Sequence, residues 1–339
     1  MRTFVCVGEN IHCTRSYKTD GKFVVKDGDR YAIPFKRDGQ PALLPIPKAF
    51  LDGADWAGGK VKHCAVAIWQ SAYGDAAGQD VGRAYLRSLA KSQEKAGATY
   101  LDINVDEIST NVPERVKLIE FTVRLAQEAS RLPMSIDSSN VDILRAGLKA
   151  CDRARGAPML NSVSLERLAA VDAAVEFGAC VIASAAGEKD LPSSTAERIA
   201  NLDRLIANLR SRGIALKAIH ADPLVFPIST DQGNGRNFLD AVAGTRKKYG
   251  EEIHIVAGLS NVSFGMPNRK LLNQVFTWLA VEAGADGGIV DPLQINGRTV
   301  QELDTNSTGF QLARALLMGE DEFGAGFIGA CRDGTLPLV

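Results

Sequence analysis

From residue 97 onward, short apolar runs alternate with longer amphipathic segments. Each apolar run ends in polar residues and predicts a strand, and with an opening run at 3–7 there are eight: 100–104, 134–137, 159–162, 181–184, 216–221, 253–258 and 288–291. Between the runs, apolar residues recur at helical spacing, as they do over 199–209. Glycines that would end helices stand just before five of the strands: Gly97, Gly178, Gly213, Gly250 and Gly284.

This alternation predicts the fold class. Strands that alternate with helices indicate a parallel sheet. Eight such units, spaced at roughly 30 residues each, are typical of an α/β fold of the (β/α)8 TIM-barrel type. An open doubly wound sheet is the alternative, but no Gly-x-Gly-x-x-Gly follows the first strand, which favours the barrel. We find no linker and expect 1–339 to form a single domain.

One stretch, residues 12–77, breaks the alternation and shows no clear helix. Within it, residues 22–26 and 30–33 flank an Asp27-Gly28 turn and predict a hairpin. Long loops in compact domains are usually lids or binding elements. We interpret 12–77 as a lid-like insertion after the first strand that covers the barrel mouth with its aromatic side chains. A plug at the bottom of the barrel, or a subunit contact, is an equal alternative.

The composition excludes several classes of function. The chain has 339 residues, is 45% hydrophobic and carries a formal net charge of −1. Its Lys and Arg residues are dispersed, so we expect no nucleic acid partner and no binding to a membrane surface. The N-terminal run lacks the features of a signal peptide, and no window reaches the roughly 18 apolar residues of a membrane span. We expect a cytoplasmic protein.

The cysteines and histidines give no convincing metal site. The six cysteines contain no Cys-x-x-Cys pair, and we expect them to be reduced. A zinc site from Cys13, His63 and Cys64 would match no standard spacing. His220 and His254 lie near predicted strands, but we interpret both as core or surface histidines. We therefore expect no metal.

Polar residues gather at the predicted carboxyl ends of the strands, which form the active face of a barrel of this type. They are mostly Asp and Asn: Glu9, Asn10, Asp102, Asn104, Asp137, Ser138, Asn140, Asn161, Ser162, Ser184, Asp222, Asn261 and Asp291. No Ser, Cys or Lys has a base partner at a spacing that indicates a nucleophile. Carboxylates and amides together suit a flat heterocycle with several N–H donors and ring nitrogens, such as a pterin. The alternative is that these residues cap helices and turns.

Several motifs together resemble those of a known family, the methyltetrahydrofolate:corrinoid methyltransferases, which include the folate-binding module of cobalamin-dependent methionine synthase. The similarity covers residues 1–11 and about 80–300. Its most specific part is Gly-Leu-Ser-Asn-Val-Ser at 258–263 with Asn268-Arg269, whereas Ile-Asp-Ser at 136–138 and Leu-Asn-Ser at 160–162 are shared with dihydropteroate synthases. The remaining motifs are Gly-Glu-Asn-Ile at 8–11, Leu-Asp-Ile-Asn at 101–104 and Asp-Pro-Leu-Val-Phe-Pro at 222–227.

The resemblance implies roles for individual residues. It implies that Asp137, Asn161 and Asp222 hold the pterin ring, that the amide of Asn261 contacts N5 of the folate, and that Arg269 lies against the ring or its tail. Asn261 is thus the candidate catalytic residue. The candidate substrate-binding residues are Glu9, Asn104, Asp137, Asn161, Ser184, Asp222, Gln232, Ser263, Arg269 and Asp291.

By this resemblance the chain transfers a methyl group between 5-methyltetrahydrofolate and the cobalt of a corrinoid (cobalamin). A methyl group on a neutral tertiary amine is a poor electrophile, so N5 must gain a proton or a strong hydrogen bond before cobalt(I) can displace it in line. The chain shows no Asp-x-His-x-x-Gly signature, so we expect a separate corrinoid protein as partner. Whether the chain forms a homodimer is left open.

Two other functions remain as alternatives. The first is dihydropteroate synthase, which shares the pterin-binding barrel but uses basic residues at the seventh strand end, where this chain has Asn261. The second is a non-catalytic pterin-binding subunit of a methyltransferase complex. A carboxamide retained at position 261 favours the methyltransferase over both.

Overall fold

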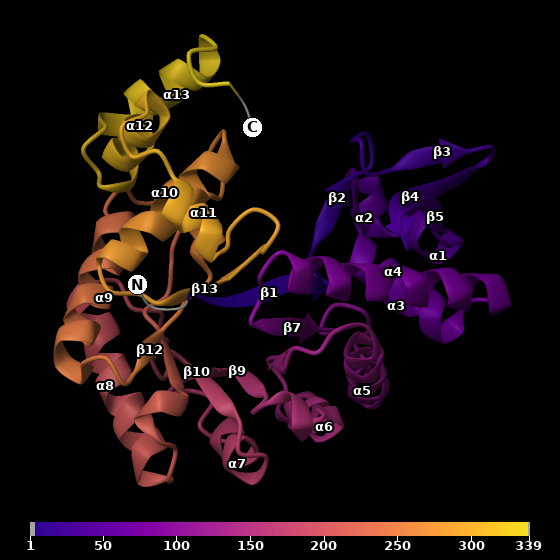
Figure 1. The fold of residues 1–339 in the computed structure, drawn as a ribbon, viewed down its shortest axis with the longest axis horizontal. Helices are drawn as coiled ribbons and strands as arrows, with labels where there is room; N and C mark the ends of the chain where they lie inside the picture. The colour runs from indigo at the N-terminus through magenta and orange to yellow at the C-terminus, as the bar shows by residue number, and fades with distance from the viewer. Residues whose placement is uncertain (1–3, 338–339) are drawn as a thin grey trace. The chain divides into compact units, whose positions relative to one another are not determined.

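The computed structural model describes residues 4–337 and contains an eight-stranded parallel sheet (Figure 1). The strands are β1 (Val5–His12), β7 (Tyr100–Asn104), β8 (Met134–Asp137), β9 (Met159–Val163), β10 (Cys180–Ser184), β11 (Ile219–Asp222), β12 (His254–Ile255) and β13 (Gly287–Val290). Their order in the sheet is β12-β11-β10-β9-β8-β7-β1-β13. Backbone hydrogen bonds from Asp286 to Ile255 and from Ile289 to Ala257 join the two end strands. The prediction of a (β/α)8 barrel is confirmed.

The helices between the strands follow the predicted rhythm. The five glycines predicted to end helices all have positive φ, as a left-handed C′ residue requires. The main helices are α4 (Ala76–Lys95), α5 (Val112–Ala129), α6 (Val141–Ala150), α7 (Ala170–Glu176), α8 (Thr195–Ser211), α9 (Asn234–Tyr249), α10 (Arg269–Glu282), α11 (Gly297–Glu302), α12 (Thr308–Leu317) and α13 (Ala325–Arg332). In residues 4–337, no helix combines the length and apolar character needed to cross a membrane.

Three strands differ from prediction by more than one residue at an end, and β9, β10 and β13 differ by a single residue. The first strand runs to His12 rather than ending at Val7, because the polar residues after Val7 find partners within the fold; Thr3, its predicted start, lies outside the described residues. The segment predicted as a strand at 216–221 begins as a 3-10 turn, η2 (Leu216–Ala218). The segment predicted at 253–258 has only two strand residues, and a 3-10 helix, η3 (Leu259–Ser263), follows shortly after it.

The chain divides into two compact units, Gly8–Leu160 and Met1–Val7 with Asn161–Val339. The expectation of a single domain over 1–339 therefore stays a prediction. The candidate residues at the ends of β7 and β8 belong to the first unit, and those from Asn161 onward belong to the second.

The segment 12–77 contains more regular structure than the pattern indicated. The hairpin around Asp27-Gly28 is confirmed, and a third strand extends it: β3 (Val25–Asp27), β4 (Arg30–Arg37) and β5 (Gln40–Pro45). The smaller elements are β2 (Ser16–Lys18), α1 (Lys48–Leu51), α2 (Ala54–Ala57) and β6 (Lys60–Lys62). The prediction of no helix was wrong, since α3 spans His63–Tyr73. This helix is buried on most sides and so lacks the amphipathic period that reveals surface helices.

Close packing joins this segment to α4. A Cβ atom at Gly82 would lie 2.8 Å from the backbone oxygen of Ala67, so only glycine lets α4 approach α3 so closely. The β3–β4–β5 sheet also contacts α4. The Phe35 ring of β4 meets the Tyr85 ring of α4 edge-on, with 5.1 Å between the ring centres. These contacts place the sheet against a helix of the barrel, and the lid-like role stays a prediction.

The packing of α6 on β8 gives a test of the fold. At Gly147 a Cβ atom would lie 2.6 Å from Cγ2 of Ile136. We therefore expect Gly147→Ala to lower the free energy of unfolding by about 1–3 kcal/mol, the usual range for overpacking a core. The measurement is the denaturant midpoint.

Gly329→Ala in α13 is the matched control, since an added Cβ there meets no atom within 4 Å. Alanine is the better helix former, so this variant should be neutral or slightly stabilised. Equal midpoints for the two variants would contradict the close packing at Gly147.

Candidate active site

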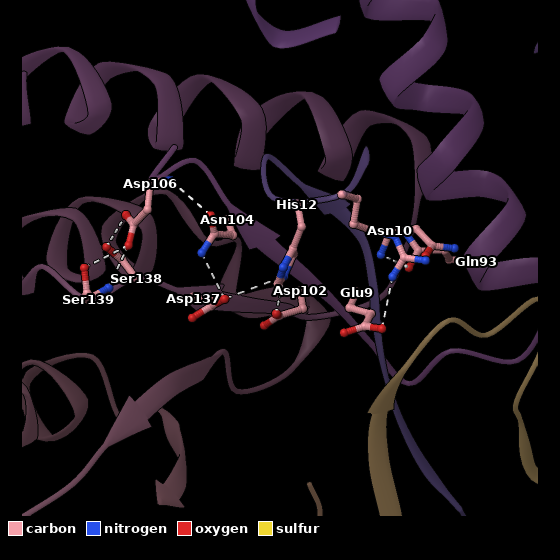
Figure 2. A network of polar contacts seen from close by, with 11 residues as sticks. Glu9, Asn10, His12, Gln93, Asp102, Asn104, Asp106, Asp137, Ser138 and Ser139 are labelled. Carbon is pink, nitrogen blue, oxygen red and sulfur yellow. Dashed lines mark hydrogen bonds and ion pairs between the residues drawn. The ribbon is translucent and has the colours of Figure 1, made fainter. Parts of the chain in front are cut away.

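In the unit Gly8–Leu160, polar side chains from three strand ends form one network (Figure 2). β7 and β8 pair in parallel register, with Asn104 opposite Asp137. Asp102 lies two residues before Asn104 and so projects from the same face of β7. His12 comes from the last position of β1. The strand register therefore determines which of these side chains meet.

His12 lies at the centre of this network. Its Nε2 atom is 2.5 Å from Oδ2 of Asp102 and 3.8 Å from Oδ2 of Asp137. Asn104 donates from Nδ2 to the same oxygen of Asp137 at 3.0 Å. The Asp137 side chain is 28% exposed, and its Oδ1 makes no hydrogen bond within residues 4–337. One carboxylate oxygen is thus fixed by the protein, and the other is available to a ligand.

The loop after β7 adds further hydrogen bonds to this network. The backbone N–H of Asp106 donates to Oδ1 of Asn104 at 3.0 Å, which orients the amide toward Asp137. The Asp106 carboxylate accepts from the hydroxyl of Ser138 at 2.6 Å and from the backbone N–H of Ser139 at 2.8 Å (Figure 2). Ser138 and Asp106 therefore hold the loops together.

Glu9 and Asn10 lie beside the network on β1. Glu9 accepts from NH1 of Arg15 at 3.0 Å. The backbone N–H of Asn10 donates to the side chain of Gln93 on α4 at 3.0 Å. These contacts explain why β1 continues through a polar sequence that we had interpreted as a strand end.

The electrostatics of the network favour an imidazolium. Burial by itself lowers the pKa of His12, but the hydrogen bond and charge of Asp102, with the charge of Asp137, outweigh it and raise the pKa to about 9. Burial raises the pKa of Asp137, and the charge of Asp102 adds to this, while His12 and Asn104 oppose it. The two groups depend on each other, because each charge stabilises the other.

The same three side chains have the composition of a metal site. Nε2 of His12 and carboxylate oxygens of Asp102 and Asp137 lie within 4.8 Å of one another. However, the 2.5 Å contact between His12 and Asp102 is a hydrogen-bond distance, which requires a proton on one of the two atoms. A divalent cation would have to displace that proton, whereas the imidazolium already supplies a positive charge.

In the second unit, Ser184 and Asp222 are register partners at the ends of β10 and β11. Oδ1 of Asp222 accepts from the backbone N–H of Leu224 at 2.8 Å, and its other oxygen makes no hydrogen bond in the described chain. Burial raises the pKa of Asp222 to about 7, although Leu224 and Arg198 lower it. Asp222 therefore resembles Asp137, with one oxygen fixed and one available.

Arg198 on α8 supports the loop after Asp222. It is fully buried, its Nε donates to the backbone oxygen of Leu224 at 3.4 Å, and its guanidinium lies 4.9 Å from the centre of the Phe226 ring. Leu224 has φ +66, a left-handed conformation that is uncommon for leucine. The buried arginine thus helps to fix an unusual loop conformation beside Asp222.

Asn261 lies on η3, and its side chain is exposed. Its amide makes no hydrogen bond within residues 4–337, although the loop around it is fastened. Arg269, at the start of α10, donates from Nε to Ser263 Oγ and from NH2 to the backbone oxygen of Ser260, both at 3.0 Å. Arg269 also lies 4.4 Å from the centre of the Phe264 ring. The loop is therefore held in place, while the Asn261 amide makes no hydrogen bond in the described chain.

The other predicted residues have varied surroundings. Ser263 is fully buried and donates to Asn273 at 2.7 Å, so it fastens the loop rather than facing a ligand. Asp291 accepts from the backbone N–H of Leu293 and from the side chain of Gln294, as a turn-capping residue does. Asn161 is buried on β9, and Gln232 is half-buried before α9.

Some strand-end residues are explained by capping, the alternative left open above. Asn140 accepts from the backbone N–H groups of Asp142 and Ile143 and is the N-cap of α6. Sequence reasoning missed His12 and Arg198 altogether. The alternation Asn10-x-His12 could have extended β1 and placed His12 on the face of Asn10, whereas no pattern in the sequence pointed to Arg198.

Comparisons with known proteins show the family of the chain. Residues 77–291 match the family model described as "Pterin binding enzyme". The chain belongs to this family of pterin-binding enzymes. It is 30% identical over 221 residues, 63% of this chain and 78% of the relative, to a methylcorrinoid:tetrahydrofolate methyltransferase of Eubacterium limosum. It is also 32% identical to a methionine synthase of Mycobacterium leprae over 222 residues, 61% of this chain but only 18% of that longer protein.

These relatives identify the chain as a methyltransferase of the pterin-binding family. Solved structures share its fold at lower identity. A dihydropteroate synthase from Xanthomonas albilineans with 7,8-dihydropteroate superposes with a TM-score of 0.53 at 18% identity, over 65% of this chain and 83% of that one. A second, from Stenotrophomonas maltophilia, gives 0.52 at 19% identity, over 66% of this chain and 86% of that one.

The four histidines allow the electrostatics to be tested directly. At pH 7 we expect His12 to be protonated, whereas burial lowers the pKa of His63 and His220 to about 3 and keeps them neutral. NMR titration of the imidazole resonances measures all three. Because its folded pKa is raised, His12 stabilises the fold below its ordinary pKa of 6.5, and this contribution is lost as the pH rises through about 9.

Asp102→Asn provides the matching variant. Burial lowers the pKa of His12, and the charge of Asp102 opposes this effect. Without that charge, the pKa of His12 should fall clearly below its value in the native chain. A native His12 that titrates near or below 6.5 would contradict the network.

Proposed function

We propose that the chain transfers the N5-methyl group between 5-methyltetrahydrofolate and the cobalt of a corrinoid that a separate protein carries. The similarity to a methylcorrinoid:tetrahydrofolate methyltransferase over 78% of that relative supports this reaction class. The observation that carries the proposal is the unengaged amide of Asn261 on a loop fastened by Arg269.

The pterin ring is the part of the substrate that these side chains suit. Asp137 and Asp222 each have one oxygen held by the protein and one without a hydrogen bond in the described chain. A carboxylate in this state can accept from an amino group or ring N–H of a pterin. We propose that Asp137, Asn161 and Asp222 bind the ring and that Glu9, Asn104, Ser184, Gln232 and Asp291 are further substrate-binding residues.

Asn261 is proposed to act on N5. A carboxamide can donate through Nδ2 to a neutral nitrogen or accept through Oδ1 from a protonated one. A contact that strengthens as N5 gains positive charge stabilises the transition state more than the ground state. Arg269 and Ser263 keep the loop in place, so the amide need not be oriented during the reaction. A reduced corrinoid, when bound, supplies the nucleophile that takes the methyl group.

Two alternatives have less support. A dihydropteroate synthase would need basic groups for the pyrophosphate of its substrate, and likeness to those enzymes at under 25% identity supports only a shared fold. A non-catalytic pterin-binding subunit would have no use for an amide presented on a fastened loop.

The experiment follows the loss of the cobalt(I) absorption band when the protein is mixed with methyltetrahydrofolate and cob(I)alamin. We expect Asn261→Ala to lower kcat about 10²-fold, the effect of removing one hydrogen bond to developing charge. Folate affinity should change much less, because the ring-binding carboxylates remain.

Asn306→Ala is the control, since Asn306 is exposed on a loop outside the candidate site. It should react like the native chain. Folate binding without turnover in the native chain would favour the non-catalytic subunit, and absence of folate binding would refute the proposal.

A further inference from the structure

The contact between His12 and two carboxylates poses an electrostatic problem. Asp102 is fully buried and Asp137 is only 28% exposed, and both face one imidazole nitrogen. Two carboxylates that share a site repel each other, and one of them takes up a proton unless a cation lies between them. A protonated Asp137 would carry an O–H and could not accept from two pterin N–H groups.

We propose that protonated His12 is a positioning residue whose charge keeps Asp137 ionised, while Asn104 holds Oδ2 and Oδ1 is left to accept a pterin N–H. This inference rests on the proposed function, since it names the group on which the ring-binding carboxylate depends. His12 itself contacts Asp102 and Asp137 rather than the ligand.

The geometry gives each partner a separate task. Asp102 fixes the imidazole, because its 2.5 Å hydrogen bond to Nε2 determines where the charge lies. Asn104 fixes the rotation of Asp137 by donating to Oδ2 at 3.0 Å. His12 approaches that same oxygen at 3.8 Å, so its charge acts on the carboxylate without occupying Oδ1.

The surrounding charges do not supply an alternative cation. Glu9 on the same strand is paired with Arg15 at 3.0 Å. Asp106, in the loop after β7, has Arg115 of α5 at 3.6 Å. Both nearby arginines therefore have carboxylates of their own, and Glu9 adds to the negative field at His12.

The proposal predicts how folate affinity depends on pH. In the native chain, affinity should stay nearly constant from pH 7 to about 9, the range in which His12 keeps its proton and Asp137 its charge. His12→Gln keeps a hydrogen-bond donor for Asp102 but removes the charge, so the pKa of Asp137 should rise further. Each unit of rise lowers the ionised fraction about tenfold at a pH below that pKa.

We therefore expect His12→Gln to bind tetrahydrofolate about tenfold more weakly at pH 7, with affinity that improves toward pH 9. The native chain should show a much flatter profile over the same range. Equilibrium titration by fluorescence or calorimetry between pH 6 and 9.5 measures both.

His254→Gln is the matched control. His254 makes the same kind of contact, Nδ1 to Asp286 at 3.0 Å, but lies at the first residue of β12, away from the carboxyl ends of the strands. The folate affinity of this variant and its pH profile should match those of the native chain. Any pH dependence that the two share then reports the titration of the ligand itself.

Three results would overturn the proposal. One is a folate affinity of His12→Gln equal to that of the native chain. Another is a loss of affinity that stays constant from pH 6 to 9.5, since a constant loss indicates a structural role only. The third is loss of native binding on adding EDTA with recovery on adding Mg²⁺ or Mn²⁺, because a metal would then occupy the position assigned to the imidazolium.

A ligand-free measurement separates this inference from the proposed function. In Asp137→Asn, the pKa of His12 observed by NMR should fall below its native value, because one of its two carboxylates is gone. An unchanged pKa would overturn the inference even if folate binds. Absence of folate binding in the native chain, with the pKa shift present, would refute the proposed function and leave the coupling between His12 and Asp137 standing.

Discussion

The desolvation of carboxylates at the strand ends is the constraint on which the site depends. Asp102 and Asp222 are buried and the Asp137 side chain is only 28% exposed, and an ionised carboxylate with so little water around it is stable only with hydrogen bonds and opposite charge. The first unit supplies His12 and Asn104 to its pair of carboxylates, and the second supplies the Leu224 N–H and the charge of Arg198 to Asp222. In each unit the residues that stabilise the carboxylate also fix its orientation, so the same contacts stabilise the charge and position it.

The loop that carries Asn261 is stabilised in a different way. Its hydrogen bonds run between Arg269, Ser263 and the backbone of Ser260, and the Arg269 guanidinium packs on Phe264. None of these contacts uses the Asn261 side chain. The loop is therefore held by the neighbours of Asn261, which leaves the hydrogen-bonding atoms of its amide available.

Barrels of this fold are not limited to methyltransferases. A dihydropteroate synthase from Xanthomonas albilineans shares the fold with this chain at 18% identity. Position 261 carries a carboxamide here, which can respond to charge at a ring nitrogen but cannot neutralise a pyrophosphate. The β3–β4–β5 sheet and α3 add a further element, and the glycine at position 82 and the ring contact of Phe35 bind them to α4.

The sequence by itself determined the barrel, because apolar runs, amphipathic spacing and helix-ending glycines are local signals that survive without tertiary context. It also identified Asp137, Asp222 and Asn261 as candidate residues, since their residue types and their positions after predicted strands can be read directly from the sequence. It did not reveal α3, whose nearly all-round burial removes the periodicity on which helix prediction relies. Nor did it reveal His12 and Arg198, because their importance lies in charges that approach them from strands or loops distant in the chain. Only the tertiary structure, through the strand register, decides which charges meet.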